Sequence, residues 1–568
     1  MENTRLYLFF GMALLIIIGW YLLIPPPKPA PPPAKPAGSA AQAPLAPGAP
    51  AALPAPAAVP AAPPVSTVAA ERVTVEAPLF VATIDGAGGT LTSFKLKDYR
   101  QLKRGLNWGD LIPPLRQWIP PSAGDDKALV DMVKQELPGD AVLGLQFVGD
   151  DALTRAFSGV VFRASTDRLT VPANGTAKLT LLGTGPGKLT VQKELVFHAD
   201  SYVVDYTVNV INYGPAARTL HVVSGFGEGP ALNATSVQRG AQHGPIDRSG
   251  GKIHKVGIGD IEGSLEVKDL QWLGIADAYF IDAARATTPV VGGVYTAGSP
   301  PGVTLDKKLR IPSFGIELPS TDLAAGKMVS NRFVLYLGPK STDDMLKFGQ
   351  RLEDSLDLTL EVIAAPMLAL LRWFDSYVGN YGVAIILLTV VVRVMLFPLT
   401  YRGMVSMKRM QKLQPRMAAL REKYKKDKER MNRETMELYR RHKVNPLGGC
   451  LPIVVQIPIF FALYSALISA IELRHAPFVL WIQDLSAHDG LYLLPIVMGC
   501  TMFFQQRMTP TSMDPTQAKI MMWMPVVFTI FMLSFPAGLM VYWSTSNLLS
   551  VTQQAIINRV KVPEPAEA

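Results

Sequence analysis

The sequence predicts a polytopic α-helical membrane protein with a large all-β domain. Two patterns divide its 568 residues. Residues 67–345 contain short runs in which apolar and polar residues alternate between Gly, Asp and Asn turns, as in strands with one buried face. Five long apolar runs follow residue 380, and another lies at residues 6–24. Apolar runs of this kind are typical of membrane-spanning helices, so we expect six spans.

The first predicted span, residues 1–24, is interpreted as an uncleaved anchor. Its 19 uncharged residues would rise about 28 Å as a helix, enough to cross the hydrocarbon core. A cleaved signal peptide usually has a shorter apolar region, and Pro25 follows this one directly. Cleavage remains an alternative because alanine-rich sequence follows. Residues 25–66 are almost entirely Pro and Ala, which predicts a semi-rigid linker near polyproline II.

Residues 67–345 are predicted to form one all-β sandwich, with a short helix at 125–137. The runs LFVATI at 79–84 and YVVDYTVNV at 202–210 show the period-two alternation most clearly.

Little in this domain indicates catalysis. Its histidines lack acids or cysteines at metal-ligand spacing, which disfavours a metal or catalytic site; they are His198, His221, His243 and His254. The glycine-rich stretch 224–230 does not lie between a strand and a helix, which argues against a phosphate-binding loop.

Residues 359–377 return to helical spacing, with apolar side chains mostly on one side. Trp373 and Phe374 suit a membrane interface, so we expect an amphipathic helix on the outer membrane surface. A helix packed against the β domain is the alternative.

The positive charge of the chain is concentrated in residues 401–447. This segment has fifteen Lys and Arg against five Asp and Glu, a surplus of ten, whereas the whole chain carries +9. A basic loop beside spanning helices is typical of the cytoplasmic side. Its helical texture predicts a cytoplasmic hairpin, which places both termini inside and the β domain outside. Nucleic-acid recognition is a poor interpretation of this charge.

The remaining spans are predicted from the apolar runs. They are expected at about 380–400, 449–471, 491–506, 520–535 and 538–558. Two apolar runs contain only fourteen or fifteen residues. As helices they would rise about 21–23 Å against a hydrocarbon core of about 30 Å, so we expect local thinning of the bilayer.

Arg393 lies inside the span at 380–400. A charge there costs on the order of 3 kcal/mol on insertion scales. An ion-coupled transporter would place acids or histidines in facing spans, and the five C-terminal spans have none in their interiors. Thr389 and Gln456 instead suggest a wet cavity that opens to the cytoplasm. The alternative is that Arg393 snorkels, since Tyr401 is only about 12 Å of helix away.

Four motifs together resemble the signature of the YidC/Oxa/Alb family of membrane-protein insertases, over roughly residues 360–558. They are VRVMLFPLT at 392–400, NPLGGCLPIVVQIPIFFALY at 445–464, LWIQDL at 480–485 and FPAGL at 535–539. The resemblance implies a five-helix insertase core in a bacterial inner membrane. The anchor, linker and outer β domain resemble the Gram-negative type, whose periplasmic domain is a β-supersandwich.

The resemblance also implies a function without an enzymatic reaction or cofactor. The expected activity is insertion and folding of nascent inner-membrane proteins, alone or with the Sec translocon, in contact with the lipid bilayer and with the ribosome at the hairpin. By resemblance, Arg393, Thr389 and Gln456 line a hydrophilic groove, and Phe460, Ser534, Tyr542 and Trp543 contact substrate; Trp543 stands where relatives often have tyrosine. An ion-coupled transporter and a sugar-acting periplasmic enzyme with a membrane anchor remain alternatives.

Overall fold

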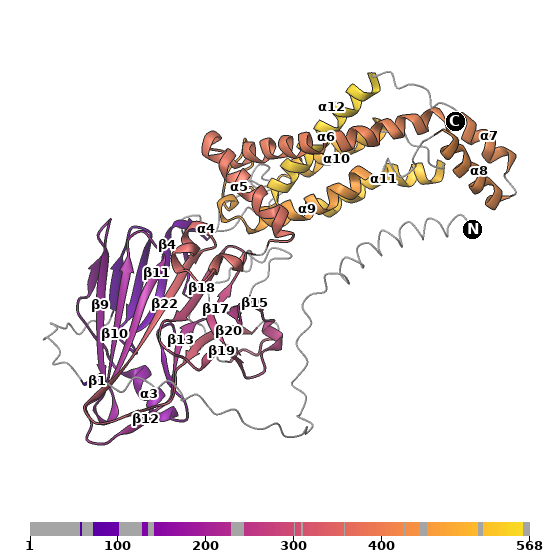
Figure 1. Cartoon of the computed structure of the whole chain (residues 1–568). Helices are drawn as coiled ribbons and strands as arrows, with labels where there is room; N and C mark the ends of the chain where they lie inside the picture. The colour runs from indigo at the N-terminus through magenta and orange to yellow at the C-terminus, as the bar shows by residue number, and fades with distance from the viewer. Residues whose placement is uncertain are drawn as a thin grey trace, which may run out of the picture. The chain divides into compact units, whose positions relative to one another are not determined.

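The computed structural model describes residues 57–58, 72–101, 128–133, 141–228, 244–299, 302–307, 310–356, 358–424, 427–442, 451–508 and 515–559. Within these ranges the chain forms a β domain and a set of helices (Figure 1). The predicted anchor and nearly all of the predicted linker lie outside the described residues.

The β domain is built from one ten-stranded sheet, two five-stranded sheets and one two-stranded sheet. The largest has the order β15-β14-β17-β18-β22-β11-β10-β9-β7, with β1 paired to β22. Its strands are β1 (Ala57–Ala58), β7 (Arg163–Ala164), β9 (Thr176–Thr184), β10 (Leu189–His198), β11 (Val203–Asn212), β14 (Gly244–Ser249), β15 (Lys252–Lys255), β17 (Leu270–Ala276), β18 (Phe280–Ala286) and β22 (Lys327–Pro339).

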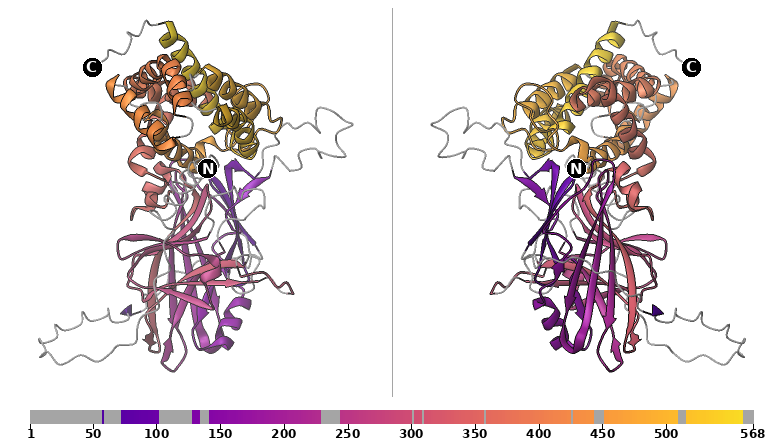
Figure 2. Two further views of the ribbon diagram at one scale, coloured as in Figure 1. Left: turned by 90° about the vertical axis from the view of Figure 1, so that its right-hand side faces the viewer. Right: turned by 90° about the vertical axis from the view of Figure 1, so that its left-hand side faces the viewer.

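The smaller sheets have the orders β16-β19-β20-β13-β6, β5-β4-β3-β2-β8 and β12-β21. Their strands are β2 (Arg72–Glu76), β3 (Phe80–Asp85), β4 (Thr90–Arg100), β5 (Leu129–Asp131), β6 (Leu145–Phe147), β8 (Arg168–Thr170), β12 (Arg218–Leu220), β13 (Val222–Gly227), β16 (Ser264–Val267), β19 (Gly292–Gly298), β20 (Ile311–Glu317) and β21 (Thr321–Leu323). Strands lie side by side in layers in all the views (Figure 2). The sandwich prediction is therefore confirmed at the level of an all-β domain.

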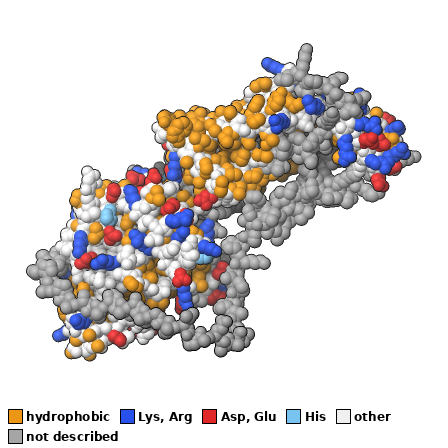
Figure 3. Space-filling model, viewed as in Figure 1, with side chains coloured by type: hydrophobic (Ala, Val, Ile, Leu, Met, Phe, Trp, Pro, Cys, Tyr) orange, Lys and Arg blue, Asp and Glu red, His pale blue; other side chains and the backbone are white. Residues whose placement is uncertain are grey.

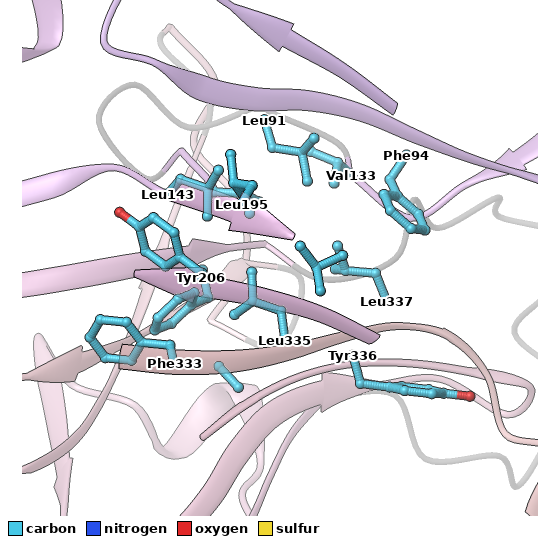
Figure 4. Packing of buried hydrophobic residues seen from close by; sticks show 14 of the residues in the cluster. Leu91, Phe94, Val133, Leu143, Leu195, Tyr206, Phe333, Leu335, Tyr336 and Leu337 are labelled. Carbon is cyan, nitrogen blue, oxygen red and sulfur yellow. The ribbon is translucent and has the colours of Figure 1, made fainter. Parts of the chain in front are cut away.

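Alternating burial explains why these segments form strands. Along β10, buried and half-buried residues alternate over most of its length, as a strand with one core-facing side requires. The buried side chains of several sheets meet in one hydrophobic core (Figure 4). There the Tyr206 and Phe333 rings stack with centroids 5.7 Å apart, although the two residues are distant in sequence.

Three details of this domain differ from the sequence prediction. Within the helix expected at 125–137, Leu129–Asp131 is a strand, β5, paired with β4, so the prediction is wrong there; the rest is described only at residues 128, 132 and 133. An unpredicted helix, α3 (Asp151–Gly159), begins where the Asp150 carboxylate accepts a hydrogen bond from the Leu153 amide. Helix α4 (Thr342–Phe348) buries Phe348 in the β core, so the domain extends beyond residue 345.

The helical part contains the longest apolar elements. Its helices are α5 (Glu361–Val378), α6 (Tyr381–Lys412), α7 (Gln414–Lys423), α8 (Lys428–Arg441), α9 (Leu451–Ser469), α10 (Leu493–Met508), α11 (Pro515–Met532) and α12 (Ala537–Arg559). On the face shown in Figure 3, hydrophobic side chains cover the long helices, whereas Lys and Arg gather over α7 and α8. Side chains such as Val394, Phe504 and Ile530 are 60–66% exposed, which suits a lipid-facing surface.

Helix α5 closely matches the amphipathic helix predicted at 359–377. Its buried residues Met367 and Leu371 share a hydrophobic core with α6 and α9, whereas Trp373 and Tyr377 are exposed. One face of this helix is therefore packed and the other is free.

Helix α6 does not end near residue 400, where the predicted span gave way to a cytoplasmic segment. It continues through Thr400 to Lys412 with Pro398 inside it. A proline removes one backbone hydrogen bond, but in a long helix the neighbouring bonds hold the backbone in place. The break lies at Leu413, just before α7 begins at Gln414, so the hairpin helices are shorter than the segment 401–447 suggested.

The predicted span at 520–535 falls mostly within helix α11 (Pro515–Met532). Helix α11 begins at Pro515, upstream of the apolar run, and its 18 residues would rise about 27 Å. Helix α10 has 16 residues, or about 24 Å. Among the described residues, α6 alone is long and apolar enough to span a membrane by itself; Val455–Ser469 and Met522–Met532 are shorter apolar helices.

Candidate functional site

A polar cluster lies between α6, α9 and α12, and Arg393 is its only charged member among the described residues. The half-buried Arg393 side chain donates from Nε to the Ser546 hydroxyl oxygen at 3.0 Å, and one terminal guanidinium nitrogen donates to the same oxygen. No carboxylate in the described ranges forms an ion pair with Arg393. The cation is thus held by a neutral group.

Tyr542 joins Gln456 to this cluster. The Tyr542 side chain is only 2% exposed, and its hydroxyl oxygen accepts a hydrogen bond from Gln456 Nε2 at 2.5 Å. Tyr542 and Ser546 are four residues apart on α12, so they share one face of the helix. Three of the residues predicted from the sequence (Arg393, Gln456 and Tyr542) are therefore brought together.

Two other predicted groove or contact residues form no side-chain hydrogen bond to this cluster within the described structure. Thr389 is fully buried, and its hydroxyl donates to the Ile385 carbonyl of its own helix at 2.6 Å. Ser534 is exposed, two residues beyond the end of α11. The groove role of Thr389 and the substrate contact of Ser534 stay predictions.

The aromatic pair among the predicted contact residues is in direct contact. The Phe460 and Trp543 rings meet edge to face, with centroids 5.0 Å apart. Because Trp543 follows Tyr542 and Phe460 lies one turn beyond Gln456, this apolar contact borders the polar cluster.

Ser546 is the member of the cluster that the resemblance did not single out. Its sequence signal is weak, since it is one of several uncharged polar residues at 544–547. Of these polar residues, Ser546 is the one that lies four positions after Tyr542, on the same helix face. Only the packing of α6 against α12 shows that its hydroxyl accepts the hydrogen bond from Arg393.

The arrangement can present a positive charge to a ligand without a fixed counter-ion. Arginine has five N–H donors, and the hydrogen bonds of Arg393 within the described structure all go to Ser546. At least one terminal nitrogen therefore has its donors available for water or for an acidic group.

Three histidines of the β domain lie beside acids, and the fourth, His243, lies outside the described residues. His198 lies 2.9 Å from Asp205, and His221 lies 2.6 Å from Glu317. No group of three metal-ligating side chains occurs among the residues that the structure describes.

A third histidine, His254, has a serine and an aspartate beside it. Ser249 and Asp247 both approach the Nδ1 atom of His254. In a nucleophilic triad the hydroxyl and the acid occupy opposite ring nitrogens, so this cluster lacks that geometry. Burial raises the pKa of Asp247, which sits at the base of the cluster.

Comparisons with known proteins cover nearly the whole chain. Residues 373–564 match the family described as 60Kd inner membrane protein, and residues 119–370 match the YidC periplasmic domain. A relative from Geotalea daltonii, named Membrane protein insertase YidC, is 36% identical over 98% of this chain and 99% of its own. A relative of the same name from Geobacter metallireducens is 38% identical over 96% and 97%.

A solved structure named as an active YidC insertase with its first transmembrane domain resolved aligns over 88% of this chain and 96% of its own. Its TM-score is 0.36 at 16% identity, which is too low to support an argument about fold. The sequence identities to these relatives, over nearly the full length of both chains, are enough to assign the family: the chain belongs to the YidC family.

Proposed function

We propose that this chain is a membrane protein insertase and chaperone of a bacterial inner membrane. The observation that carries the proposal is the Arg393 guanidinium, which is held by Ser546 without a carboxylate partner among the described residues. A charge inside an apolar helix is costly and rarely persists unless it is used. Family membership and the names of the relatives support the same activity.

The proposed topology has six spans, with both termini and the hairpin in the cytoplasm and the β domain in the periplasm. The exposed apolar faces of α10, α11 and α12 support membrane embedding. The basic charge of the hairpin supports its cytoplasmic side. The match to a periplasmic domain model supports the location of the β domain.

The proposed mechanism is physical rather than enzymatic. A hydrophilic segment of the substrate enters the groove around Arg393, Gln456 and Tyr542, where polar groups lower its desolvation cost. Arg393 attracts acidic residues of that segment. The substrate's apolar segment then partitions into lipid past Phe460 and Trp543, driven by its own transfer free energy.

Thr389 and Ser534 are retained in the proposal in their family roles, as groove and substrate-contact positions respectively. The proposed partners are nascent inner-membrane proteins, the Sec translocon for some substrates, and the ribosome, which would meet the basic hairpin. Electrostatic attraction between the hairpin and the ribosomal surface supports the last of these.

Replacement of Arg393 tests the proposal. In cells depleted of the native protein, we expect Arg393→Ala to lower insertion of substrates with acidic outer segments by about tenfold, the equivalent of about 1.4 kcal/mol of lost charge-assisted hydrogen bonding. Arg393→Lys separates charge from guanidinium geometry, since it keeps only the charge.

The control variant is Arg372→Ala. It removes an arginine that forms an ion pair of 2.7 Å with Glu472 and is not part of the polar cluster. If every substrate tested is still inserted by Arg393→Ala, the residue merely snorkels and the proposed role of its charge is wrong. Substrate-dependent ion flux in vesicles would instead favour a transporter.

A further inference from the structure

The ten-stranded sheet has an incomplete edge along its longest strand, β22. On one side β11 pairs with β22 from Met328 to Tyr336. On the other side β18 pairs with β22 only from Phe333 to Pro339. The last backbone hydrogen bond on that side runs from the Thr287 amide to the Arg332 carbonyl. The first residues of β22 therefore have one side that β18 does not cover.

The backbone groups at this uncovered edge follow from the alternation of a strand. In an antiparallel sheet the N–H and C=O of one residue point to one neighbouring strand, and those of the next residue point to the other. Both groups of Arg332 point to the β18 side, where they bond Thr287 and Thr288. Two and four residues earlier, Ser330 and Met328 therefore present their backbone groups at the uncovered edge. Such a row of groups is a template for another strand.

Strand β1, which belongs to the Pro/Ala linker, lies on this edge. It pairs antiparallel with β22, with Ala57 opposite Met328 and Ala58 opposite Lys327. Because the backbone groups of Met328 point to this side, Ala57 faces β22 with its own N–H and C=O. The N–H and C=O of Ala58 then point outward, away from the sheet.

The prolines of the linker agree with this register. Proline has no N–H, so an edge strand accepts it only where the backbone nitrogen faces away from the neighbouring strand. Pro56 directly precedes Ala57, and Pro54 stands two residues earlier. Continued in the same register, the strand gives both prolines outward-facing positions. Alternating prolines thus leave one side of the linker able to pair and remove donors from the other side, which ends the sheet.

Tethering favours the linker of the same chain over any other occupant. Two paired residues form few hydrogen bonds, and each contributes only modestly because water competes for the same groups. Residues 59–71, however, join β1 to β2 of the same domain. A short flexible connection gives an effective concentration in the millimolar range, which a strand from another molecule lacks.

We propose that the uncovered edge of β22, from Met328 to Ser330, is a docking site for the chain's own Pro/Ala linker, by addition of one strand. The docked linker seals the largest sheet against pairing with other chains. It also ties the linker to the β domain at one end of β22, about 37 Å along the strand from Pro339, the end that leads to α4. The proposal is independent of the insertion activity.

Disulfide trapping tests the register in full-length protein that carries Cys450→Ser and Cys500→Ser. Ala58→Cys with Lys327→Cys should form an intramolecular disulfide on mild oxidation, because opposite residues of an antiparallel pair have Cα atoms about 4.5–5.5 Å apart. The control, Ala58→Cys with Met328→Cys, is shifted by one residue and places the two thiols on opposite faces of the sheet. We expect its yield to be lower by about fivefold or more.

Two proline variants test which side of the linker faces β22. Ala57→Pro removes the donor that faces Met328, so hydrogen exchange of the Met328 amide should become about fivefold faster, as expected for the loss of one hydrogen bond. Ala58→Pro places its proline at an outward-facing position and should leave that exchange rate unchanged. Mass spectrometry of the peptide that contains Met328 gives both rates.

The proposal is overturned if the two cysteine pairs give equal yields, or if Ala57→Pro and Ala58→Pro have the same effect on exchange at Met328. A disulfide-linked dimer in place of the intramolecular bridge also overturns it, since the edge would then bind a second copy of the chain. Both variants of each pair differ only by one position, so a general disturbance of the linker would affect them alike. None of these measurements depends on insertion, so failure of the proposed function leaves the test unchanged.

Discussion

Two buried charged residues of the β domain show how the surroundings of one side chain decide its effect on stability. The fully buried Lys193 amine donates to the carbonyl oxygens of Gly88, Gly89 and Leu143 at 2.7–3.0 Å. Three donors therefore meet three acceptors, although burial lowers the pKa of Lys193 to about 7. Asp282 is equally buried, yet neither carboxylate oxygen has a hydrogen-bond partner within the described structure.

Asp282 is predicted to make the protein less stable as the pH rises. Burial, with the negative charges of Asp277 and Asp131, raises the pKa of Asp282 well above its ordinary value. The unfolded chain loses this proton near pH 4, whereas the folded chain keeps it to higher pH. Stability is therefore complete below about pH 4 and falls by about 1.4 kcal/mol per pH unit until the folded-state pKa is reached.

We expect Asp282→Asn to remove this pH dependence and to be more stable than the native protein at pH 7 in thermal unfolding of the full chain in detergent. Asp322→Asn, at an exposed position of β21, is the control and should follow the native pH profile. If the stability of Asp282→Asn and that of the native protein change with pH in parallel, the Asp282 carboxylate does not destabilise the folded protein and the prediction is wrong.

At the scale of elements, α6 and α12 are joined by a series of polar contacts along their length. After Arg393 and Ser546 comes a hydrogen bond of 2.8 Å from Gln553 to the Thr400 hydroxyl, seven residues further along each helix. The Lys408 amine then donates to the Ile557 carbonyl at 3.1 Å. The seven-residue step from the first contact to the second keeps both partners on the facing sides of two parallel helices. The third contact lies eight residues further along α6 and four further along α12.

This pairing predicts a measurable coupling between Thr400 and Gln553. In a double-mutant cycle with Thr400→Val and Gln553→Leu, we expect an interaction free energy of about 0.6 kcal/mol, the usual size for polar contacts between membrane helices. Thermal unfolding in detergent is the measurement. Thr552→Val is the matched control, since the Thr552 hydroxyl donates to Leu548 of its own helix and should not couple to Thr400.

Elements were predictable where one local pattern decides them. The alternation along β10 and the long apolar runs of α6 and α12 lead directly to the strands and helices found. The strand at Leu129–Asp131 was missed because three residues carry almost no periodicity and depend on pairing with β4. The predicted span ended near residue 400 because the apolar run ends there, whereas α6 continues to Lys412, since backbone hydrogen bonding does not depend on side-chain polarity.

The candidate site was only partly predictable for a different reason. Arg393 is visible as a charge in an apolar run, but its contact with Ser546 depends on how α6 and α12 are rotated against each other. The contact between Gln456 and Tyr542 likewise joins two helices through residues that lie 86 positions apart in sequence. The resemblance identified Arg393, Gln456 and Tyr542 as site residues, but which side chains they contact is determined by the packing of the helices.

At the scale of the whole molecule, the β domain and the helical part have separate hydrophobic cores. One core is built almost entirely from strands β2–β22 and helices α3 and α4. The other contains only residues from α5 onward, including Ala384, Leu463 and Met540. The polar cluster draws all its residues from the second set of elements. The proposed insertion chemistry therefore uses no side chain of the β domain.

It follows that deletion of residues 72–339, from β2 to β22, should leave insertion largely intact. We expect the shortened chain to support insertion in depleted cells within about threefold of the full protein, because helices bury most of their stabilising surface against one another. Arg393→Ala in the shortened chain should lower insertion as it does in the full protein, which shows that the same site is used. Loss of insertion by a shortened chain that is present in the membrane at the normal level would instead give the β domain a direct part in the activity, and would favour the alternative in which the helices mainly anchor it.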